Sequence, residues 1–329
     1  LSHNVIARDK VLYDGHAVAA VAATTPTIAA QAAALVEADY EVLPHVMKAL
    51  DAMKPDAPLL HEDMFTAGVE PTPTTPSNVS KRVAFTLGDV GVGFGDADVV
   101  VEHEFNTETV HQGYIEPHAC VAAIAEDGMA TIWCSSQGQF MVRAYTARVC
   151  GMEVAKIKVV PSEIGGGFGG KTTIYLEPLA VELARRAGRP VKMVMTRDEV
   201  FRATGPTSGG HAYCKIGAKK DGTITAASLQ LEYEAGAFDG SPVALGCMTG
   251  FAPYDLENVS IVGYDVVVNR PKSAAYRAPG APVAAFAVES TLDELARKLA
   301  MDPIALRENN AAKEGTRAAY GPKFNRIGF

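Results

Sequence analysis

The chain has 329 residues, of which 48% are hydrophobic and 21% charged, with 30 basic and 38 acidic side chains and a formal net charge of −8. This length suggests about two domains with room for a sizeable core. The acidic balance argues against a nucleic-acid-binding protein, which needs a basic surplus to neutralise phosphates. No apolar run approaches the roughly 18 residues of a membrane span, and residues 1–10 hold no export signal.

Three elements are expected before residue 70. His16–Ala23 and Tyr40–Leu43 are apolar segments typical of strands, and the Ala-rich segment Thr27–Ala38 between them predicts a helix. The prolines and polar residues of Glu70–Asn78 predict a linker. The expected organisation is a partial αβ domain at 1–69, a Pro/Thr-rich linker at 70–79 and a second domain at 80–329.

Two hairpins are expected beyond the linker, each carried by an Asp-Gly turn. Before them, Gly91–Gly95 is interpreted as a turn that leads into a strand at Val99–Phe105. The turns at Asp127-Gly128 and Asp221-Gly222 lie between alternating apolar segments, which is a strong hairpin signal. The paired segments are 119–125 with 129–134, and 212–218 with 223–233.

A strand, loop and helix pattern separates the two hairpins. Ile157–Val160 predicts a strand, Gly165–Gly170 a loop, and the following residues an amphipathic helix that ends at Gly188, with Glu177 on its polar face. A strand at Val191–Met195 then completes a candidate βαβ unit over residues 157–195.

The C-terminal part predicts two further helices. Val288, Leu292, Leu295 and Leu299 recur at helical spacing and are expected to face inward, and Pro303 is placed to open the next helix. Strands and helices together indicate a mixed αβ fold of the α+β class.

Five cysteines lie far apart in the chain, and no Cys-x-x-Cys occurs. This spacing removes iron–sulfur and zinc-ribbon sites from the chain, and the odd number argues against a disulfide scaffold. We therefore expect a cytoplasmic location and thiols that act as small buried side chains. The cysteines are Cys120, Cys134, Cys150, Cys214 and Cys247.

The glycine-rich segment Gly165–Thr172 matches G-x-x-x-x-G-K-[ST], the pattern of a phosphate-binding P-loop. In that interpretation Lys171 reaches the phosphates, Thr172 binds Mg²⁺, and Asp198 supplies an acid after the next strand. A structural interpretation also exists, because glycines at a strand–helix turn supply positive φ angles. His111, Glu116 and His118 have a poor spacing for a metal site, so structural roles are expected for them.

A linked set of three motifs decides between these interpretations of the glycine-rich segment. Ser135–Phe140, Glu163–Lys171 and Ser273–Pro282 occur in an order and spacing that resembles the large, molybdenum-binding subunit of the xanthine oxidase family, the molybdenum hydroxylases. The resemblance covers essentially the whole chain. It implies a remnant of an N-terminal αβ hammerhead-type domain followed by the first molybdopterin-binding domain, so the chain resembles the N-terminal half, or a fragment, of that subunit.

The resemblance also implies the site residues. In the family the glycine loop approaches the molybdenum and its pterin through backbone amides, and no protein side chain ligates the metal directly. Gln137 matches a glutamine that hydrogen-bonds an oxygen on molybdenum, and Arg277 lies in the arginine-centred loop beside the substrate, so both are catalytic candidates. The implied cofactor-binding residues are Gln137, Gly166, Gly167, Phe168, Gly169, Gly170, Arg277 and Ala278, and the implied substrate-pocket residues are Tyr276, Pro279 and Thr172.

Three departures from the purine-oxidising members bear on the substrate. Those members carry a glutamate where this sequence has Thr172, and a stacking aromatic residue where it has Pro279. The stretch Ser241–Tyr254, which aligns loosely with a pocket-lining region, contains no arginine. These departures argue against xanthine as the substrate.

The chemistry implied by the resemblance is hydroxylation of an aldehyde or N-heterocycle with water as the oxygen source. The implied cofactors are molybdopterin, as such or as a dinucleotide, with molybdenum, and FAD and [2Fe-2S] clusters on partner chains or domains. The implied partners in such a heteromeric complex are an iron–sulfur subunit, an FAD subunit and the C-terminal molybdopterin-binding half. Because that half holds the family's glutamate base, the isolated chain is expected to be inactive. Two alternatives stay open: a P-loop nucleotide hydrolase using Gly165–Thr172, and a non-catalytic αβ scaffold.

Overall fold

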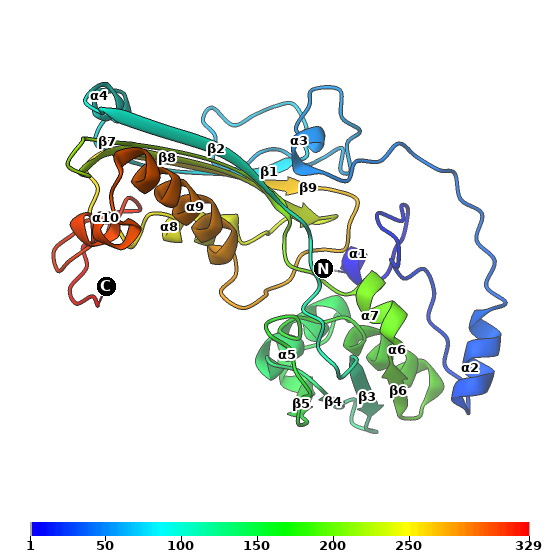
Figure 1. Ribbon diagram of the computed structural model, residues 1–329. Coiled ribbons are helices and arrows are strands. Elements are labelled where there is room, and N and C mark those ends of the chain that lie inside the picture. Colours follow the sequence, from blue (N-terminus) through cyan, green and yellow to red (C-terminus); the bar gives the residue numbers. More distant parts are fainter. Residues whose placement is uncertain (1, 329) are drawn as a thin grey trace. The chain divides into compact units, whose positions relative to one another are not determined.

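The computed structural model describes residues 2–328 and contains two compact units (Figure 1). Unit 1 comprises residues 2–45, 110–207 and 269–277, and unit 2 comprises residues 46–109, 208–268 and 278–328. Both units are built from discontinuous stretches of chain. The division at residues 70–79 that the sequence suggests stays a prediction.

Unit 1 is built on a four-stranded sheet with the order β5-β4-β3-β6. The predicted Asp-Gly hairpin is confirmed, with Cys120 opposite Cys134, and β5 pairs parallel to β4 while β6 pairs antiparallel to β3. The strands of the predicted βαβ unit, β5 and β6, are therefore separated by the hairpin rather than adjacent. The strand bounds are Ala119–Ile124 for β3, Ala130–Cys134 for β4, Ile157–Pro161 for β5 and Val191–Val194 for β6.

Helices α5 and α6 of unit 1 bury their apolar residues against this sheet. Helix α6 ends at Gly188 with φ 60°, the left-handed conformation that the sequence predicts there. The prediction that Glu177 lies on the polar face of this helix is wrong. Glu177 is buried in the first turn, where its carboxylate accepts a hydrogen bond of 2.9 Å from the Tyr175 N–H. Burial raises the pKa of this carboxyl. The helices are α1 (Ser2–Val5), α2 (Pro26–Ala33), α5 (Gln139–Val149), the 3-10 helix η1 (Val154–Lys156), α6 (Glu177–Ala187) and α7 (Arg197–Ala203).

The two strands predicted near the N-terminus are wrong. His16–Ala23 and Tyr40–Leu43 are irregular, and the helix between them, α2, is shorter than predicted. A strand needs a neighbour to pair its N–H and C=O groups, and neither segment has a strand partner within residues 2–328. Val42, in the second of these segments, is accordingly 87% exposed.

Unit 2 is built on a five-stranded sheet with the order β1-β9-β8-β7-β2. The second predicted hairpin is confirmed as the antiparallel pair β7–β8, and β9 pairs parallel to β8 after a crossover that contains α8. The strand at Val99–Phe105 is confirmed as part of β2. The strand bounds are Val79–Leu87 for β1, Val99–Thr107 for β2, Gly210–Ala218 for β7, Ile224–Gly236 for β8 and Val259–Val267 for β9.

Three helices, α8, α9 and α10, lie on one face of this sheet (Figure 1). Val288, Leu292 and Leu295 of α9 are fully buried, which confirms the inward face predicted from their spacing, and α10 begins at Pro303 as expected. The bounds are Ala49–Ala52 for α3, Val243–Thr249 for α8, Ala281–Leu299 for α9 and Pro303–Asn309 for α10.

One predicted turn is a helix. Gly91–Gly95 belongs to α4 (Val90–Gly95), whose first turn is capped by the Asp89 carboxylate through hydrogen bonds from the N–H groups of Gly91, at 2.8 Å, and Val92, at 3.2 Å. The N-cap compensates for the poor helix propensity of three glycines. Glu70–Asn78, in contrast, has neither helix nor strand, as predicted.

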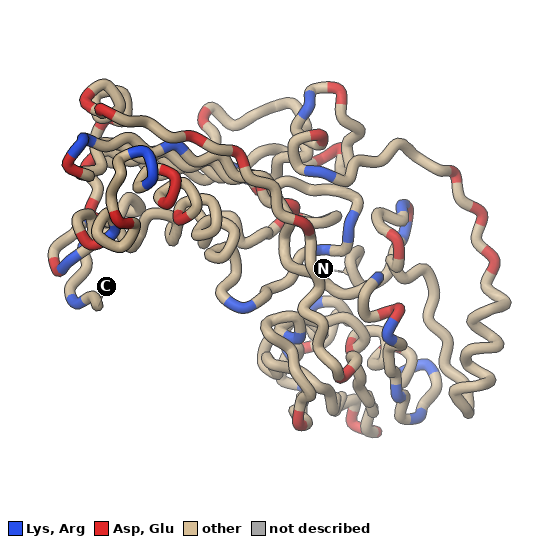
Figure 2. Tube along the Cα trace, viewed as in Figure 1, with Lys and Arg blue, Asp and Glu red and all other residues tan. Residues whose placement is uncertain are grey.

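Basic and acidic residues are scattered over both units (Figure 2). Several ion pairs in the described part of the chain join exposed side chains, such as Lys48 with Glu108 and Lys54 with Asp51. Lys171 is different, because its side chain is fully buried in unit 1.

Candidate functional site

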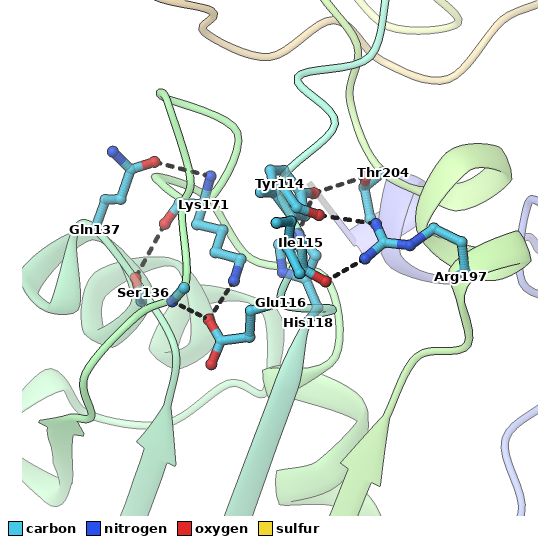
Figure 3. A network of polar contacts seen from close by, with 10 residues as sticks. Tyr114, Ile115, Glu116, His118, Ser136, Gln137, Lys171, Arg197 and Thr204 are labelled. Atoms are coloured by element: carbon cyan, nitrogen blue, oxygen red, sulfur yellow. Dashed lines mark hydrogen bonds and ion pairs between the residues drawn. The ribbon is translucent and has the colours of Figure 1, made fainter.

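Four loop segments of unit 1 meet at one edge of its sheet. Strands β4 and β5 run parallel and end there, and β3, which runs the other way, begins there. This edge therefore gathers residues 112–118 before β3, residues 135–138 after β4 and the glycine loop, which we define as Gly165–Lys171, after β5 (Figure 3). Residues 273–277 join them through a hydrogen bond of 2.9 Å from the Arg277 N–H to the Phe168 carbonyl.

The density of glycines in the loop follows from close packing as well as from backbone conformation. A Cβ on Gly167 would lie 2.5 Å from Gln137 Oε1, and one on Gly169 would lie 2.6 Å from the Ala275 carbonyl oxygen. Gly169 also has φ 105°. The interpretation that the glycines only supply positive φ is therefore incomplete, because the loop must also pass very close to its neighbours.

Phe168, at the centre of the loop, has a left-handed backbone with φ 53°. This conformation costs a non-glycine residue about 1 kcal/mol or more, so the surrounding contacts must hold it in place. Its carbonyl accepts the Arg277 N–H, and its side chain is 50% exposed.

The Gln137 side chain fastens the second half of the loop. Its Oε1 accepts hydrogen bonds from the N–H groups of Gly169, at 2.8 Å, and Lys171, at 3.2 Å. Its backbone N–H donates to the Lys171 carbonyl at 2.9 Å. The amide nitrogen Nε2 donates to no other described residue, so it is free to meet a ligand.

Three consecutive backbone N–H groups in the loop also lack an acceptor. The N–H groups of Gly165, Gly169 and Gly170 are all hydrogen-bonded. Those of Gly166–Phe168 donate to no atom within residues 2–328, although Gly167 is buried. Since a buried N–H is costly when unpaired, and adjacent amide dipoles favour anionic oxygens, the loop is suited to bind an oxygen-rich, anionic group.

Lys171, the last residue of the loop, points into the protein. Its Nζ lies 2.6 Å from Glu116 Oε2 and 4.9 Å from the centroid of the Tyr114 ring, and its side chain has no exposed area (Figure 3). Burial by itself raises the pKa of Glu116, but the hydrogen bonds from Lys171 and the Gly165 N–H outweigh it and lower that pKa.

This arrangement does not support the P-loop interpretation. A P-loop lysine must reach a bound phosphate, whereas Lys171 is buried and already neutralised. The Thr172 hydroxyl donates to the Gly169 carbonyl at 2.7 Å, and the next helix begins only at Glu177. Asp198, the proposed acidic partner, forms an exposed ion pair with Arg202 at 3.0 Å.

A buried network lies beside Lys171 and uses residues that the sequence presented only as poor metal ligands. The Tyr114 hydroxyl lies 2.6 Å from His118 Nε2 and 3.1 Å from the Thr204 hydroxyl, which in turn lies 2.8 Å from His111 Nε2. Burial lowers the pKa of His111 to about 4 and that of His118 to about 3, so both rings are neutral at pH 7. These histidines have structural partners in the network.

The arginine-centred segment is fixed by a residue that the sequence did not reveal. Gln112 is buried, and its Nε2 donates to the carbonyls of Ala275, at 2.9 Å, and Gly205, at 3.0 Å. The Arg277 guanidinium is exposed and has no partner among the described residues, and Tyr276 is 36% exposed. A single glutamine outside any recognisable motif carries no local signal, which explains why Gln112 was missed.

The structure thus brings together most of the predicted site within unit 1. Gln137, Gly166–Gly170, Thr172 and Arg277 lie in segments joined by the hydrogen bonds described above. Ala278 and Pro279 belong to unit 2, where Ala278 has φ 58°.

The five cysteines are free thiols. Four are buried and Cys150 is half-buried, as the sequence predicts, and burial raises the pKa of the Cys120 and Cys134 thiols. Among residues 2–328 there is no helix with the length and apolar character needed to cross a membrane.

Comparison with known families gives two matches along the chain. The family described as "Molybdopterin cofactor-binding domain" matches residues 72–311, and "Aldehyde oxidase and xanthine dehydrogenase, a/b hammerhead domain" matches residues 1–44. The chain is 30% identical over 319 residues to the nicotinate dehydrogenase large molybdopterin subunit of Eubacterium barkeri, covering 95% of this chain and 71% of the relative. It is 29% identical over 309 residues to the xanthine dehydrogenase molybdenum-binding subunit of Escherichia coli, covering 93% of this chain but only 39% of that one.

Solved structures show the same similarity. The aldehyde oxidoreductase of Desulfovibrio gigas matches with a TM-score of 0.84 and 30% identity, over 92% of this chain and 32% of that chain. A CO dehydrogenase from Oligotropha carboxidovorans matches with a TM-score of 0.82 and 29% identity, over 92% of this chain and 40% of that chain. With the mixed αβ fold, the glycine loop and these matches combined, the chain belongs to the molybdopterin cofactor-binding family of the xanthine dehydrogenases and aldehyde oxidases.

Proposed function

We propose that this chain forms part of the molybdenum-binding catalytic subunit of a hydroxylase that oxidises an aldehyde or an N-heterocycle, with water as the source of oxygen. The observation that carries the proposal is the set of three adjacent N–H groups in Gly166–Phe168 that have no acceptor within residues 2–328. They lie in a loop whose neighbours leave no room for side chains at Gly167 and Gly169. Family membership supports molybdopterin as the group that these donors meet.

The donor set fits such a group because it offers N–H groups that can donate to the oxygens of the group. The N–H groups of Gly166–Phe168 and Nε2 of Gln137 all donate without titrating, so they suit anionic and oxo oxygens at any physiological pH. Gly169 and Gly170 bring the backbone close, and Arg277, with Ala278 beside it, supplies a permanent positive charge. When bound, the molybdenum cofactor supplies the two-electron redox chemistry that hydroxylation requires.

The substrate class rests on the residues assigned to the pocket, Tyr276, Pro279 and Thr172. Tyr276 offers an aromatic wall, and the exposed guanidinium of Arg277, which has no partner in the described part of the chain, can orient a carbonyl or carboxylate. Thr172 offers no carboxylate to a purine ring, and its hydroxyl already donates to the Gly169 carbonyl. The lack of a carboxylate at Thr172 supports an aldehyde or an N-heterocycle other than xanthine as the substrate.

Hydroxylation releases two electrons, which must leave the site. The thiols of this chain are dispersed and mostly buried. The proposal therefore includes FAD and [2Fe-2S] clusters on partner chains or domains, together with the C-terminal molybdopterin-binding half, in a cytoplasmic complex. Related proteins are named as subunits, which supports a heteromeric assembly.

The test is to purify the protein with its partner chains and measure three quantities: molybdenum content, pterin content, and transfer of isotope from labelled water to an aldehyde or heterocycle. We expect both cofactor components and labelled product. Absence of molybdenum and pterin, together with Mg²⁺-dependent ATP binding that Lys171→Ala abolishes, would restore the P-loop alternative. Retention of neither ligand by the full complex would favour the scaffold alternative.

A further inference from the structure

Both ends of the glycine loop are held by one carboxylate oxygen. Oε2 of Glu116 accepts a hydrogen bond of 2.8 Å from the N–H of Gly165, the first residue of the loop. The same atom lies 2.6 Å from Nζ of Lys171, the last residue of the loop. The Glu116 backbone N–H also donates to the Gly165 carbonyl at 3.2 Å. Glu116 therefore closes the loop at its base (Figure 3).

The backbone that carries Glu116 is itself anchored. The guanidinium of Arg197, the first residue of α7, donates to the Tyr114 carbonyl at 2.9 Å and also to the Ile115 carbonyl. Pro117 follows Glu116 and restricts it to extended conformations. The carboxylate is thus presented from a fixed support.

The position of this contact matters for the free donors. Gln137 holds the N–H groups of Gly169 and Lys171, and Glu116 holds Gly165 and the Lys171 ammonium. Only the middle of the loop, Gly166–Phe168, keeps N–H groups without an acceptor among the described residues. With its two ends fixed, the loop has few ways to turn these three N–H groups away from a ligand.

We propose that Glu116 is a positioning residue that joins the two ends of the glycine loop and so aims the N–H groups of Gly166–Phe168 at the molybdopterin group. This inference rests on the proposed function. Glu116 acts through the loop and does not itself touch the cofactor. Its loss therefore changes loop order and cofactor retention, beyond any change in global stability.

A double variant separates positioning from simple stabilisation. Glu116→Met with Lys171→Met removes both charges together, and apolar residues of similar size often replace a buried ion pair with little loss of stability. The double variant therefore leaves no buried ammonium without a counter-ion, as Glu116→Met alone would. It still removes the acceptor of the Gly165 N–H. Glu182→Gln is the matched control, because Glu182 forms an exposed ion pair with Arg185 in the same unit.

The experiment compares the purified complexes by denaturation, amide hydrogen exchange over residues 163–172, and molybdenum and pterin content per chain. For the double variant we expect a denaturation midpoint lowered about as little as in Lys171→Met alone, exchange at Gly165 and Gly169 faster by about tenfold or more, as for loss of a hydrogen bond to a charged group, and a matching fall in cofactor content. The Glu182→Gln control should match the parent in all three measurements. Parental exchange and cofactor content in the double variant would overturn the proposal.

Glu116→Asp provides a second test if the double variant does not fold. Aspartate keeps a negative charge beside Lys171 but is one methylene shorter. It should therefore be unable to accept the hydrogen bond from the Gly165 N–H while it pairs with Lys171. We expect faster loop exchange and lower cofactor content with a folded protein, and a parental result contradicts the proposal. If the parent complex itself holds no molybdopterin, the proposed function fails, and loop exchange in the cofactor-free protein still decides whether Glu116 holds the loop.

Discussion

The buried ion pair between Lys171 and Glu116 predicts an asymmetry between two single substitutions. Glu116→Gln removes the carboxylate and leaves the Lys171 ammonium, which has no exposed area, without a counter-ion. Stranding a buried charge in this way costs about 3–5 kcal/mol of unfolding free energy. The glutamine oxygen can still accept the Gly165 N–H, so the cost comes mainly from the charge.

The opposite substitution should cost less. Lys171→Met leaves the Glu116 carboxylate, whose side chain is 33% exposed and which keeps its hydrogen bond from the Gly165 N–H. Water can solvate the exposed part, and methionine fills much of the space that the lysine stem occupied. We expect a loss of about 1–2 kcal/mol, the range for one hydrogen bond to a charged group.

Denaturant unfolding at pH 7 of the protein in its assembled form measures the difference, with the double variant Glu116→Gln/Lys171→Met closing the cycle. We expect the double variant to resemble Lys171→Met, because the stranded charge is gone. In thermal unfolding the gap of about 2–3 kcal/mol between the single variants corresponds to about 4–12 °C, taking about 2–4 °C per kcal/mol for a unit of this size. Equal losses, or a larger loss for Lys171→Met, would refute the view that Lys171 is charged and buried beside Glu116.

Three further outcomes are expected. Gly169→Ala should lower the unfolding free energy by about 2 kcal/mol or more and reduce the pterin content, because the new Cβ would clash and the backbone has φ 105°. Gly188→Ala is the control: with φ 60° and open space around its Cβ, it should cost only about 1 kcal/mol and leave the pterin content unchanged. The folded pKa values of about 4 for His111 and about 3 for His118 lie below the ordinary 6.5, so the unfolded chain binds protons first and the unfolding free energy falls as the pH drops below 6.5. The expected fall is up to about 1.4 kcal/mol per pH unit for each ring. Denaturation between pH 7 and 4 measures this fall, and His118→Gln should make the unfolding free energy less dependent on pH. Gln137→Ala should lower the hydroxylation rate of the assembled enzyme far more than its denaturation midpoint, and normal turnover would contradict the role of its free amide.

Several elements were predictable because their signals lie within a few residues. The two Asp-Gly turns define hairpins by their backbone conformation alone, and Gly188 ends α6 because glycine adopts positive φ without strain. The inward face of α9 follows from spacing along the helix. The linked motifs around Gln137, Phe168 and Arg277 were sufficient for the family, and the family descriptions that match the chain confirm it.

Other features could not be predicted because they depend on partners that are distant in sequence. His16–Ala23 has a strand composition but no strand partner among the residues that the structure describes, and Glu177 is buried although its spacing places it on a polar face. Gly167 must be glycine because of Gln137, a residue on another loop. Local sequence contains none of these contacts.

Lys171 shows the difference most clearly. The sequence by itself determined a glycine loop between a strand and a helix, ending in a lysine, and that pattern fits a phosphate site and a cofactor loop equally well. The tertiary structure decided between them by placing Glu116, which is 55 residues earlier in the chain, 2.6 Å from the lysine ammonium. Turn conformation and helical spacing are encoded locally, whereas the orientation of a buried charged side chain depends on which opposite charge the fold places near it.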